Sequence, residues 1–376
     1  MLQLLAEAHR REANLIDRMR TVVEIESPSS DKAAVDHALT VFGAWAEHAG
    51  GRLQWHRHHG YGNSLEVRFG KTSAREKPIL LLGHLDTVWD HGTIKHMPWT
   101  VTRDRIAGPG VLDMKAGVLM ALTAVEMLGD RPIQRRPITL LLHGDEEIGS
   151  PASRRVTESV ASRSCAVYVL EPAQGDAGAY KTARKAVGMY RLAVHGIAAH
   201  SGVDFERGHS AVVELARQIG TLTGFTNHAK GISVNPGLIA GGTRSNVVAA
   251  EAWAEIDVRV ARRRDIPPLD RKFRSLKPHD RCCTLEWTGG INRPPMERSP
   301  GTVALFRRAQ TLAAEAGLAL EEAATGGGSD GNFTAALGIP TLDGMGAVGS
   351  GAHAAHEHLE RKHLALRTAM LAAMLI

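Results

Sequence analysis

Cysteine is scarce in this sequence. Its 376 residues include three cysteines, Cys165 and the adjacent pair Cys282 and Cys283, which are too few and too poorly spaced for a disulfide framework or a CxxC zinc site. Long hydrophobic runs are also missing. Runs such as Pro78 to Gly83 and Ile138 to Leu142 fall well short of the ~20 apolar residues that a membrane helix needs. We therefore expect a protein of a reducing compartment with no membrane partner.

Aromatic residues and a strong excess of one charge are lacking as well. Aromatic residues make up 5% of the sequence, and 45 Lys and Arg residues against 40 Asp and Glu residues leave a net charge of +5. Nucleic-acid binding usually shows a basic face with interleaved aromatic side chains, so we expect no nucleic-acid partner. Residues 1–20 mix acidic and basic side chains at helical spacing, unlike the uncharged core of a secretory signal. The sequence thus predicts a cytoplasmic protein.

The sequence does contain a regular alternation of helix and strand patterns. With 43% hydrophobic residues, the chain can form a full core in one or two domains. Helical spacing predicts helices over 31–49 and after Lys115, and strand patterns occur at 52–55, 64–69, 79–82, 138–143 and 166–170. Continuous apolar strands separated by helices are typical of a sheet that is covered on both faces. We predict an α/β fold in which helices cover a mixed sheet.

The pattern changes after about residue 185. Strand patterns at 189–194, 232–239, 251–260 and 283–287 alternate with helical patterns at 211–221 and 270–276, which indicates a smaller α+β unit. After Pro294 and Pro295 a helical pattern returns at 302–316, followed by a short strand near 340–342 and a closing helix from Leu359. We predict a catalytic domain made of residues 1–184 and 294–376, with a smaller α+β domain, 185–293, inserted into it.

Side chains of the type that bind metals follow strands or lie in Gly-rich turns at five places. These are His84-Leu85-Asp86, Asp113-Met114-Lys115, Asp145-Glu146-Glu147, Glu171-Pro172, and His353 with Glu357. Because the carboxyl ends of the strands line the ligand crevice of an α/β sheet, these side chains can converge. Two imidazoles and several carboxylates without a thiolate suit Zn²⁺, Mn²⁺ or Co²⁺. The size of the set indicates two ions that share a bridging carboxylate.

Two of these places also predict roles next to the ions. Asp86 lies two residues after His84 on an extended segment, so its carboxylate can accept the second N–H of the imidazole. Glu146 and Glu147 are adjacent and cannot face the same way, so one can bind metal while the other takes a proton from water. Taken alone, His84 could be a buried structural histidine, and Glu146 and Glu147 could be a solvated pair in a loop. The complete set favours a metal centre.

The stretches that contain these residues closely resemble the co-catalytic dizinc metallopeptidase family of glutamate carboxypeptidase, acetylornithine deacetylase and succinyl-diaminopimelate desuccinylase. In chain order they are Gly83 to Val88, Gly108 to Gly117, Asp145 to Ser150, Glu171-Pro172, Ala199 to Gly202, Ser245-Asn246, Asp257 to Arg259, Thr325 to Asp330 and His353 to Glu357. They follow the order of the family's motifs and extend over nearly the whole chain.

The resemblance implies two divalent ions, with Zn²⁺ preferred and Mn²⁺ or Co²⁺ as alternatives. It implies that Asp113 bridges the ions, that His84 and Glu171 complete one site, and that Glu147 and His353 complete the other. It also implies a cis peptide after the bridging aspartate.

Further roles follow from the same resemblance. Glu146 would be the general base and acid, with Asp86 beside it in the catalytic machinery. The inserted domain would act as a lid and form a homodimer, so that His200 and Asn246 reach the active site of the other subunit. There His200 would help to stabilise the oxyanion.

The resemblance also bears on substrate binding. Arg259 would bind the free carboxylate of the substrate with its planar guanidinium, and backbone N–H groups of Gly327 and Gly328 could contact the same carboxylate. Lys181 and Arg184 are candidates for a second cation, although for both the sequence favours a solvated surface position.

The motifs are most similar to those of the glutamate carboxypeptidase branch. This similarity predicts hydrolysis that releases a C-terminal amino acid, with glutamate as a candidate, from a peptide or N-acyl substrate. Two alternatives stay open. One is an N-acyl amino-acid deacylase of the acetylornithine deacetylase or desuccinylase type, and the other is a metal-free binding protein on the same fold.

Overall fold

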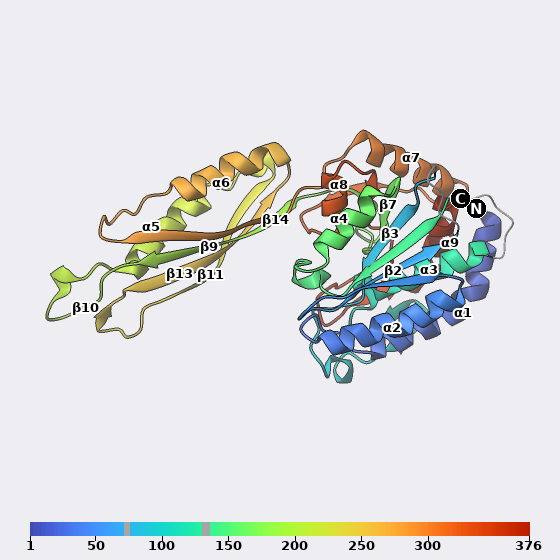
Figure 1. Ribbon diagram of the computed structural model, residues 1–376, viewed down its shortest axis with the longest axis horizontal. Coiled ribbons are helices and arrows are strands. Elements are labelled where there is room, and N and C mark those ends of the chain that lie inside the picture. The colour runs from blue at the N-terminus through green and yellow to red at the C-terminus, as the bar shows by residue number, and fades with distance from the viewer. Residues whose placement is uncertain (71–75, 130–135) are drawn as a thin grey trace. The chain divides into compact units, whose positions relative to one another are not determined.

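The computed structural model describes residues 1–70, 76–129 and 136–376. The chain divides into two compact units (Figure 1). The first unit contains residues 1–183, 298–325 and 329–376, and the second unit contains residues 184–297 and 326–328. The second unit therefore includes Arg184, residues 294–297 and part of the Gly-rich turn, in addition to the segment 185–293 singled out in the sequence.

A six-stranded sheet forms the centre of the first unit. Its strands, in spatial order, are β1 (Arg52–His56), β2 (Ser64–Phe69), β6 (Ile138–His143), β3 (Ile79–His84), β7 (Ala166–Val169) and β16 (Thr341–Leu342). The strand β3 runs parallel to β6 and β7, and β16 runs parallel to β7, whereas β1 and β2 are antiparallel additions. The predicted mixed sheet is confirmed.

Helices cover both faces of this sheet, as predicted. They are α1 (Leu2–Glu24), α2 (Lys32–His48), α3 (Ala116–Gly129), α4 (Arg154–Ser162), α7 (Pro300–Ala314), α8 (Gly331–Ala336) and α9 (Leu364–Met374). Alternate residues of a strand point to opposite faces. In β3, Leu81 packs into the core shared with α1, α3 and α9, whereas Leu80 and Leu82 pack with Val160 of α4. Burial on both faces explains why β3 is a continuous apolar run.

The first unit also contains two smaller sheets made of short strands. The strands β17 (Gly349–Ser350), β18 (His358–Glu360), β5 (Arg105–Ala107) and β4 (Thr100–Val101) form a second sheet, and β15 (Glu322–Thr325) pairs with β8 (Tyr180–Arg184). The closing helix was expected from Leu359, but α9 begins at Leu364. The expectation was wrong because residues 358–360 pair with β5, a contact between distant segments that helical spacing cannot reveal.

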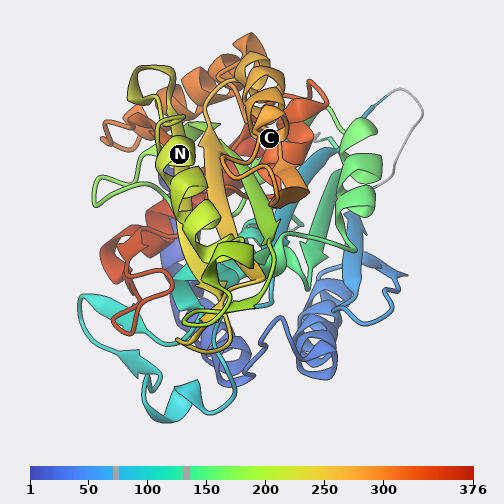
Figure 2. The same cartoon turned by 90° about the vertical axis from the view of Figure 1, so that its left-hand side faces the viewer.

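The second unit has a core of its own. Its antiparallel sheet has the order β11 (Ile232–Gly241), β13 (Glu251–Val260), β9 (Ala186–His195) and β14 (Thr284–Arg293). The helices α5 (Ala211–Thr223) and α6 (Ile266–Ser275) lie along this sheet (Figure 2). Buried apolar residues of both helices and of the sheet form one hydrophobic core. Two further short strands of this unit, β10 (Ala199–His200) and β12 (Val247–Val248), pair with each other antiparallel. This unit is α+β, as expected. Among the described residues, no helix is both long enough and apolar enough to cross a bilayer.

Candidate metal centre

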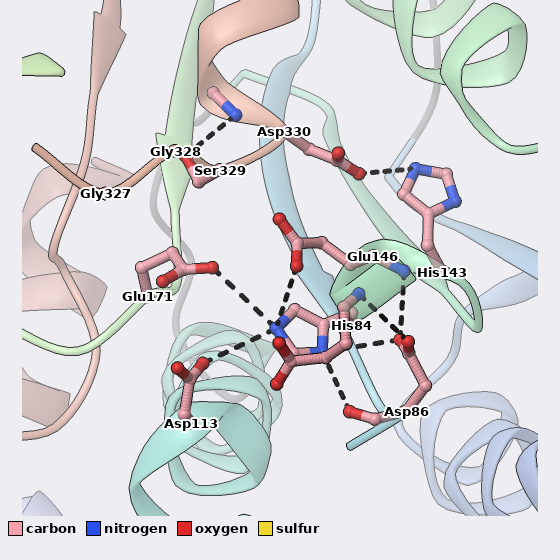
Figure 3. Close-up of polar contacts among 12 residues, drawn as sticks. His84, Asp86, Asp113, His143, Glu146, Glu171, Gly327, Gly328, Ser329 and Asp330 are labelled. Carbon is pink, nitrogen blue, oxygen red and sulfur yellow. Dashed lines mark hydrogen bonds and ion pairs between the residues drawn. The ribbon is translucent and has the colours of Figure 1, made fainter. Parts of the chain in front are cut away.

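The sheet of the first unit brings the predicted ligands to one edge. His84 ends β3, Glu146 and Glu147 follow β6, and Glu171 follows β7. Because β6 and β7 run parallel to β3 on its two sides, the carboxyl ends of the three strands meet there. Figure 3 shows the carboxylates of Asp113, Glu146 and Glu171 directed at the imidazole of His84.

His84 is the centre of the first group of contacts. Its Nε2 atom lies 3.5 Å from Asp113 Oδ1, 3.7 Å from Glu171 Oε1 and 4.0 Å from Glu146 Oε2. Ligand atoms that surround one Zn²⁺ tetrahedrally lie about 3.4 Å apart, because each is about 2.1 Å from the ion. The distances from His84 Nε2 to Asp113 and to Glu171 are therefore close to what a shared ion requires. Ligand atoms of His84, Asp113 and Glu147, and likewise those of His84, Glu146 and Glu171, all lie within 4.8 Å of one another.

A second group of contacts uses the other oxygen of Asp113. His353 Nε2 lies 3.4 Å from Asp113 Oδ2 and 3.2 Å from Glu147 Oε2. The two oxygens of Asp113 thus face two different imidazoles, His84 on one side and His353 on the other. This is the arrangement that a carboxylate needs in order to bridge a pair of cations. The peptide bond between Asp113 and Met114 is cis, as the family resemblance implied.

Two buried atoms in this cluster have no hydrogen-bond partner. Within the described part of the chain, His84 Nε2 and Asp113 Oδ1 are buried and make no hydrogen bond. Polar atoms in the interior are normally satisfied, because removing them from water without a partner is costly. A divalent cation between them would satisfy both. The donor set, which is imidazole and carboxylate only, also suits such an ion.

The charges of the cluster favour a bound cation as well. Burial opposes ionisation of Asp113, but the imidazoles of His353 and His84 outweigh it and hold its pKa well below its usual range. Hydrogen bonds to Asp113 and Glu147 raise the pKa of His353 to about 11. Burial raises the pKa of Glu147 to about 7. Burial opposes a charge on His84, but Asp113, Asp86 and Glu171 outweigh it and hold its pKa well above its usual value. Each imidazole is thus stabilised in its positive form, which means that the pocket attracts positive charge.

Asp86 holds the turn that carries the two glutamates. Its carboxylate accepts hydrogen bonds from Ser29 Oγ at 2.7 Å and from the backbone N–H groups of Glu146 and Glu147 at 3.2 and 3.1 Å. The carboxylate was expected to accept the second N–H of His84. Instead, His84 Nδ1 lies 3.0 Å from the backbone oxygen of Asp86 and 3.4 Å from its carboxylate. The backbone oxygen is the better acceptor, because the carboxylate is directed at the turn.

Behind the same turn lies a buried polar group that sequence reasoning missed. Ser150 Oγ donates to Asp330 Oδ1, and His143 Nε2 lies 3.9 Å from Asp330 Oδ2. The two nitrogens of His143 also bond to the hydroxyls of Ser64, at 2.8 Å, and Thr157, at 2.7 Å. Ser150 and Asp330 each end a matched motif, which was the available signal. His143 and Ser64 gave none.

The predicted substrate residues lie in the second unit. His200 pairs with Val247 across β10 and β12, and Ser201 N–H donates to the backbone oxygen of Asn246. His200 and Asn246 are therefore close to each other, and both are exposed. Arg259, on β13, donates from Nε and Nη2 to the carboxylate of Asp257, both at 2.8 Å. The guanidinium group that was expected to bind substrate is thus paired with a carboxylate on its own strand.

Arg184 binds the Gly-rich turn within the second unit. Arg184 Nη1 donates to the carbonyls of Gly327 and Gly328 at 3.1 and 3.0 Å. Arg184 is 4% exposed and Lys181 is 7% exposed, so the solvated positions favoured for both were wrong. For Arg184 the physical reason is that the carbonyls of the turn replace water as its hydrogen-bond acceptors.

The sequence is similar to those of known proteins over most of its length. Residues 80–376 match the family described as Peptidase family M20/M25/M40. The chain is 30% identical over 292 residues to carboxypeptidase G2 from Pseudomonas sp. (strain RS-16), a match that covers 76% of this chain and 70% of that protein. It is 29% identical over 311 residues to succinyl-diaminopimelate desuccinylase from Acidovorax ebreus (strain TPSY), covering 78% of each.

The fold is shared with solved structures as well. A tripeptidase from Staphylococcus aureus superposes with a TM-score of 0.78 at 20% identity, covering 97% of each chain. At this identity the likeness concerns the fold alone.

Proposed function

Because this chain belongs to the peptidase family M20/M25/M40, whose members are metal-dependent hydrolases, we propose that it hydrolyses amide bonds with two divalent ions, as a carboxypeptidase. The product would be a C-terminal amino acid, with glutamate as a candidate, released from a peptide or N-acyl substrate. The observation that carries this proposal is the position of Asp113, whose two oxygens lie 3.5 Å from His84 Nε2 and 3.4 Å from His353 Nε2. The similarity to carboxypeptidase G2 supports the choice of bond.

The residues that would hold the ions form two overlapping sets. His84, Asp113 and Glu171 would hold one ion, and Asp113, Glu147 and His353 would hold the other. Zn²⁺ fits this nitrogen and oxygen set best, and Mn²⁺ or Co²⁺ would also fit. When bound, such ions make water more acidic and polarise the carbonyl of the substrate.

Glu146 is the proposed proton carrier. It takes a proton from the attacking water and later delivers it to the leaving nitrogen. Two features support this role: its carboxylate oxygen lies 4.0 Å from His84 Nε2, and Asp86 fixes its backbone by accepting its N–H. A fixed backbone keeps the carboxylate at one distance from the reacting atoms, which is what general base catalysis requires.

The second unit would supply the groups that bind substrate. We propose that it forms a homodimer, in which His200 and Asn246 reach the active site of the other subunit and His200 stabilises the oxyanion. Arg259, with the N–H groups of Gly327 and Gly328, would bind the free carboxylate of the substrate. Since Arg259 is paired with Asp257, substrate binding would exchange one carboxylate for another.

A second candidate function is an N-acyl amino-acid deacylase of the same family. The 29% identity to a succinyl-diaminopimelate desuccinylase favours it. Both activities use the same ions and the same base, so they differ only in the group on the acyl side of the bond. Comparing amino-acid release from peptidyl and from N-acyl substrates separates them. The metal-free binding protein is disfavoured, because all five predicted ligands contact another member of the set.

Replacement of the proposed base tests the mechanism. We expect Glu146→Gln to keep both ions but to lower kcat by about 10²- to 10⁴-fold, because the amide cannot accept the proton. Metal content is measured by elemental analysis and turnover by release of free amino acid, with the wild-type protein as the control. Turnover at the wild-type rate would remove Glu146 from the mechanism. A purified wild-type protein that takes up no divalent ion would instead refute the proposal as a whole.

A further inference from the structure

The carboxylate of Glu357 is surrounded by hydrogen-bond donors. Its Oε2 atom accepts from Trp89 Nε1 and from the backbone N–H of Gly110, both at 2.9 Å. Its Oε1 atom accepts from the backbone N–H groups of Leu112 and Asp113, at 2.9 and 3.1 Å. The side chain is buried, with 1% of the residue exposed.

This arrangement excludes Glu357 as a metal ligand, although it was grouped with His353 in the sequence. An ionised carboxylate offers about four lone-pair positions to donors. Four N–H groups occupy them here. The carboxylate is therefore directed at the backbone that leads to Asp113.

The segment from Gly110 to Asp113 needs such an acceptor. It lies between β5 and α3, Gly110 has a φ of +70°, and Asp113 has the non-helical angles φ −115° and ψ 97°. Irregular backbone of this kind leaves N–H groups that no regular helix or sheet pairs, and buried N–H groups need a partner. Glu357 is that partner for three of them.

We propose that Glu357 is the positioning residue of the bridging aspartate: it clamps the backbone of residues 110–113 so that the two oxygens of Asp113 face His84 and His353. The inference rests on the proposed function, since it assigns Glu357 an effect on the affinity for the ions. Glu357, only four positions after His353, thereby holds the backbone of Asp113. The turn that supplies one imidazole also supplies the anion that orients the shared carboxylate.

The chemistry requires glutamate and excludes glutamine. In Glu357→Gln one oxygen becomes an NH₂ group, which is a donor and faces two N–H groups whichever way the amide turns. Two of the four hydrogen bonds are then lost, and the backbone before Asp113 is free to shift. Trp89→Phe is milder, because it removes one donor and leaves the carboxylate in place.

Glu214 offers a matched control in the second unit. It is also 1% exposed, and its carboxylate accepts from the backbone N–H groups of His279 and Asp280, both at 3.0 Å, and from Gln218 Nε2 at 2.7 Å. Glu214→Gln therefore makes the same chemical change in an equally buried carboxylate that contacts none of the proposed ligands.

The test compares affinity for Zn²⁺, measured by competition with a coloured chelator, with thermal unfolding of the metal-free protein. We expect Glu357→Gln to weaken binding of the ions about 10- to 100-fold and Trp89→Phe to weaken it about 2- to 10-fold. Glu214→Gln should lower the unfolding temperature and leave the affinity unchanged.

The outcomes separate this inference from the proposed function. Wild-type affinity in Glu357→Gln would overturn the inference while the two-ion proposal stands. If that variant does not fold, unchanged affinity in Trp89→Phe overturns it instead. Weakened affinity in Glu214→Gln as well would reduce the effect to general destabilisation and also overturn it. A wild-type protein that binds no ion refutes the proposed function, and the inference fails with it.

Discussion

Four carboxylates in and beside the candidate metal centre divide into two kinds according to what their oxygens contact. Those of Asp86 and Glu357 accept N–H groups of the backbone, and they hold the turns in place. Those of Asp113 and Glu147 face the imidazole of His353, and they are available to cations. The division follows from geometry, because a carboxylate whose lone pairs are already used by N–H donors cannot also bind an ion.

His143 gives a pH dependence to stability. It is fully buried, and burial lowers its pKa in the folded protein although Asp330 and Asp145 act in the opposite direction. In the unfolded chain its pKa returns to about 6.5. As the pH falls below about 6.5, the unfolded chain binds a proton that the folded protein does not, so the free energy of unfolding falls by up to about 1.4 kcal/mol per pH unit.

Urea denaturation of the metal-free protein at several values between pH 5 and pH 8 measures this effect. We expect His143→Gln to lose part of the decline that the wild-type protein shows on acidification. Parallel curves for the two proteins would mean that His143 does not contribute.

At the level of elements, one contact of α3 sets the spacing of two proposed ligands. Asp113 lies just before this helix, and Gly117 in its first turn packs on Leu170, the residue before Glu171. A Cβ at Gly117 would lie 2.0 Å from the backbone oxygen of Leu170. Only a glycine allows the helix to approach the end of β7 this closely.

Gly117→Ala is therefore expected to lower the free energy of unfolding by about 1–3 kcal/mol, through overpacking, and to weaken binding of the ions. Chemical denaturation and metal titration measure the two effects. Gly129→Ala, at the exposed end of the same helix, is the control, because a Cβ there meets no atom of the described residues within 4 Å. Equal stability of the two variants would show that the contact does not determine the position of the helix.

The elements differ in how far they could be predicted from sequence. The strands β3, β6 and β7 were recognisable because burial on both faces makes them continuous apolar runs, and the ligands directly after them could be predicted to converge. The start of α9 could not be predicted, because it depends on pairing between β18 and β5. The burial of Arg184 and the orientation of Glu357 likewise depend on distant backbone groups, which no local pattern reports.

At the level of the whole molecule, the second unit has the surface that the proposed homodimer needs. The strand β11 is at an edge of its sheet, and its Leu238 and Ile239 are 57% and 60% exposed. Val212 and Val213 of α5 are exposed as well. Open strand edges and exposed apolar side chains are features of surfaces that associate. They support dimerisation through this unit.

Mixing two inactive variants tests whether subunits share active sites. Refolding His200→Ala together with Glu146→Gln should restore activity, because in a mixed dimer one site combines an intact Glu146 with an intact His200 of the partner subunit. With random pairing about one quarter of the wild-type activity is expected. Size measurement by light scattering confirms the dimer. If the mixture stays as inactive as its components, His200 does not act across the dimer.

His353 and α9 both come late in the sequence, which has a consequence for folding during translation. During synthesis, four of the proposed ligands leave the ribosome long before His353 does: His84, Asp113, Glu147 and Glu171. The helix α1 is also made long before α9, with which it shares the core of the first unit. A nascent chain therefore carries an unfinished core and an unfinished set of ligands at the same time. The same late part of translation completes both, so a partly synthesised chain would have an incomplete set of the proposed ligands and would bind a metal ion weakly.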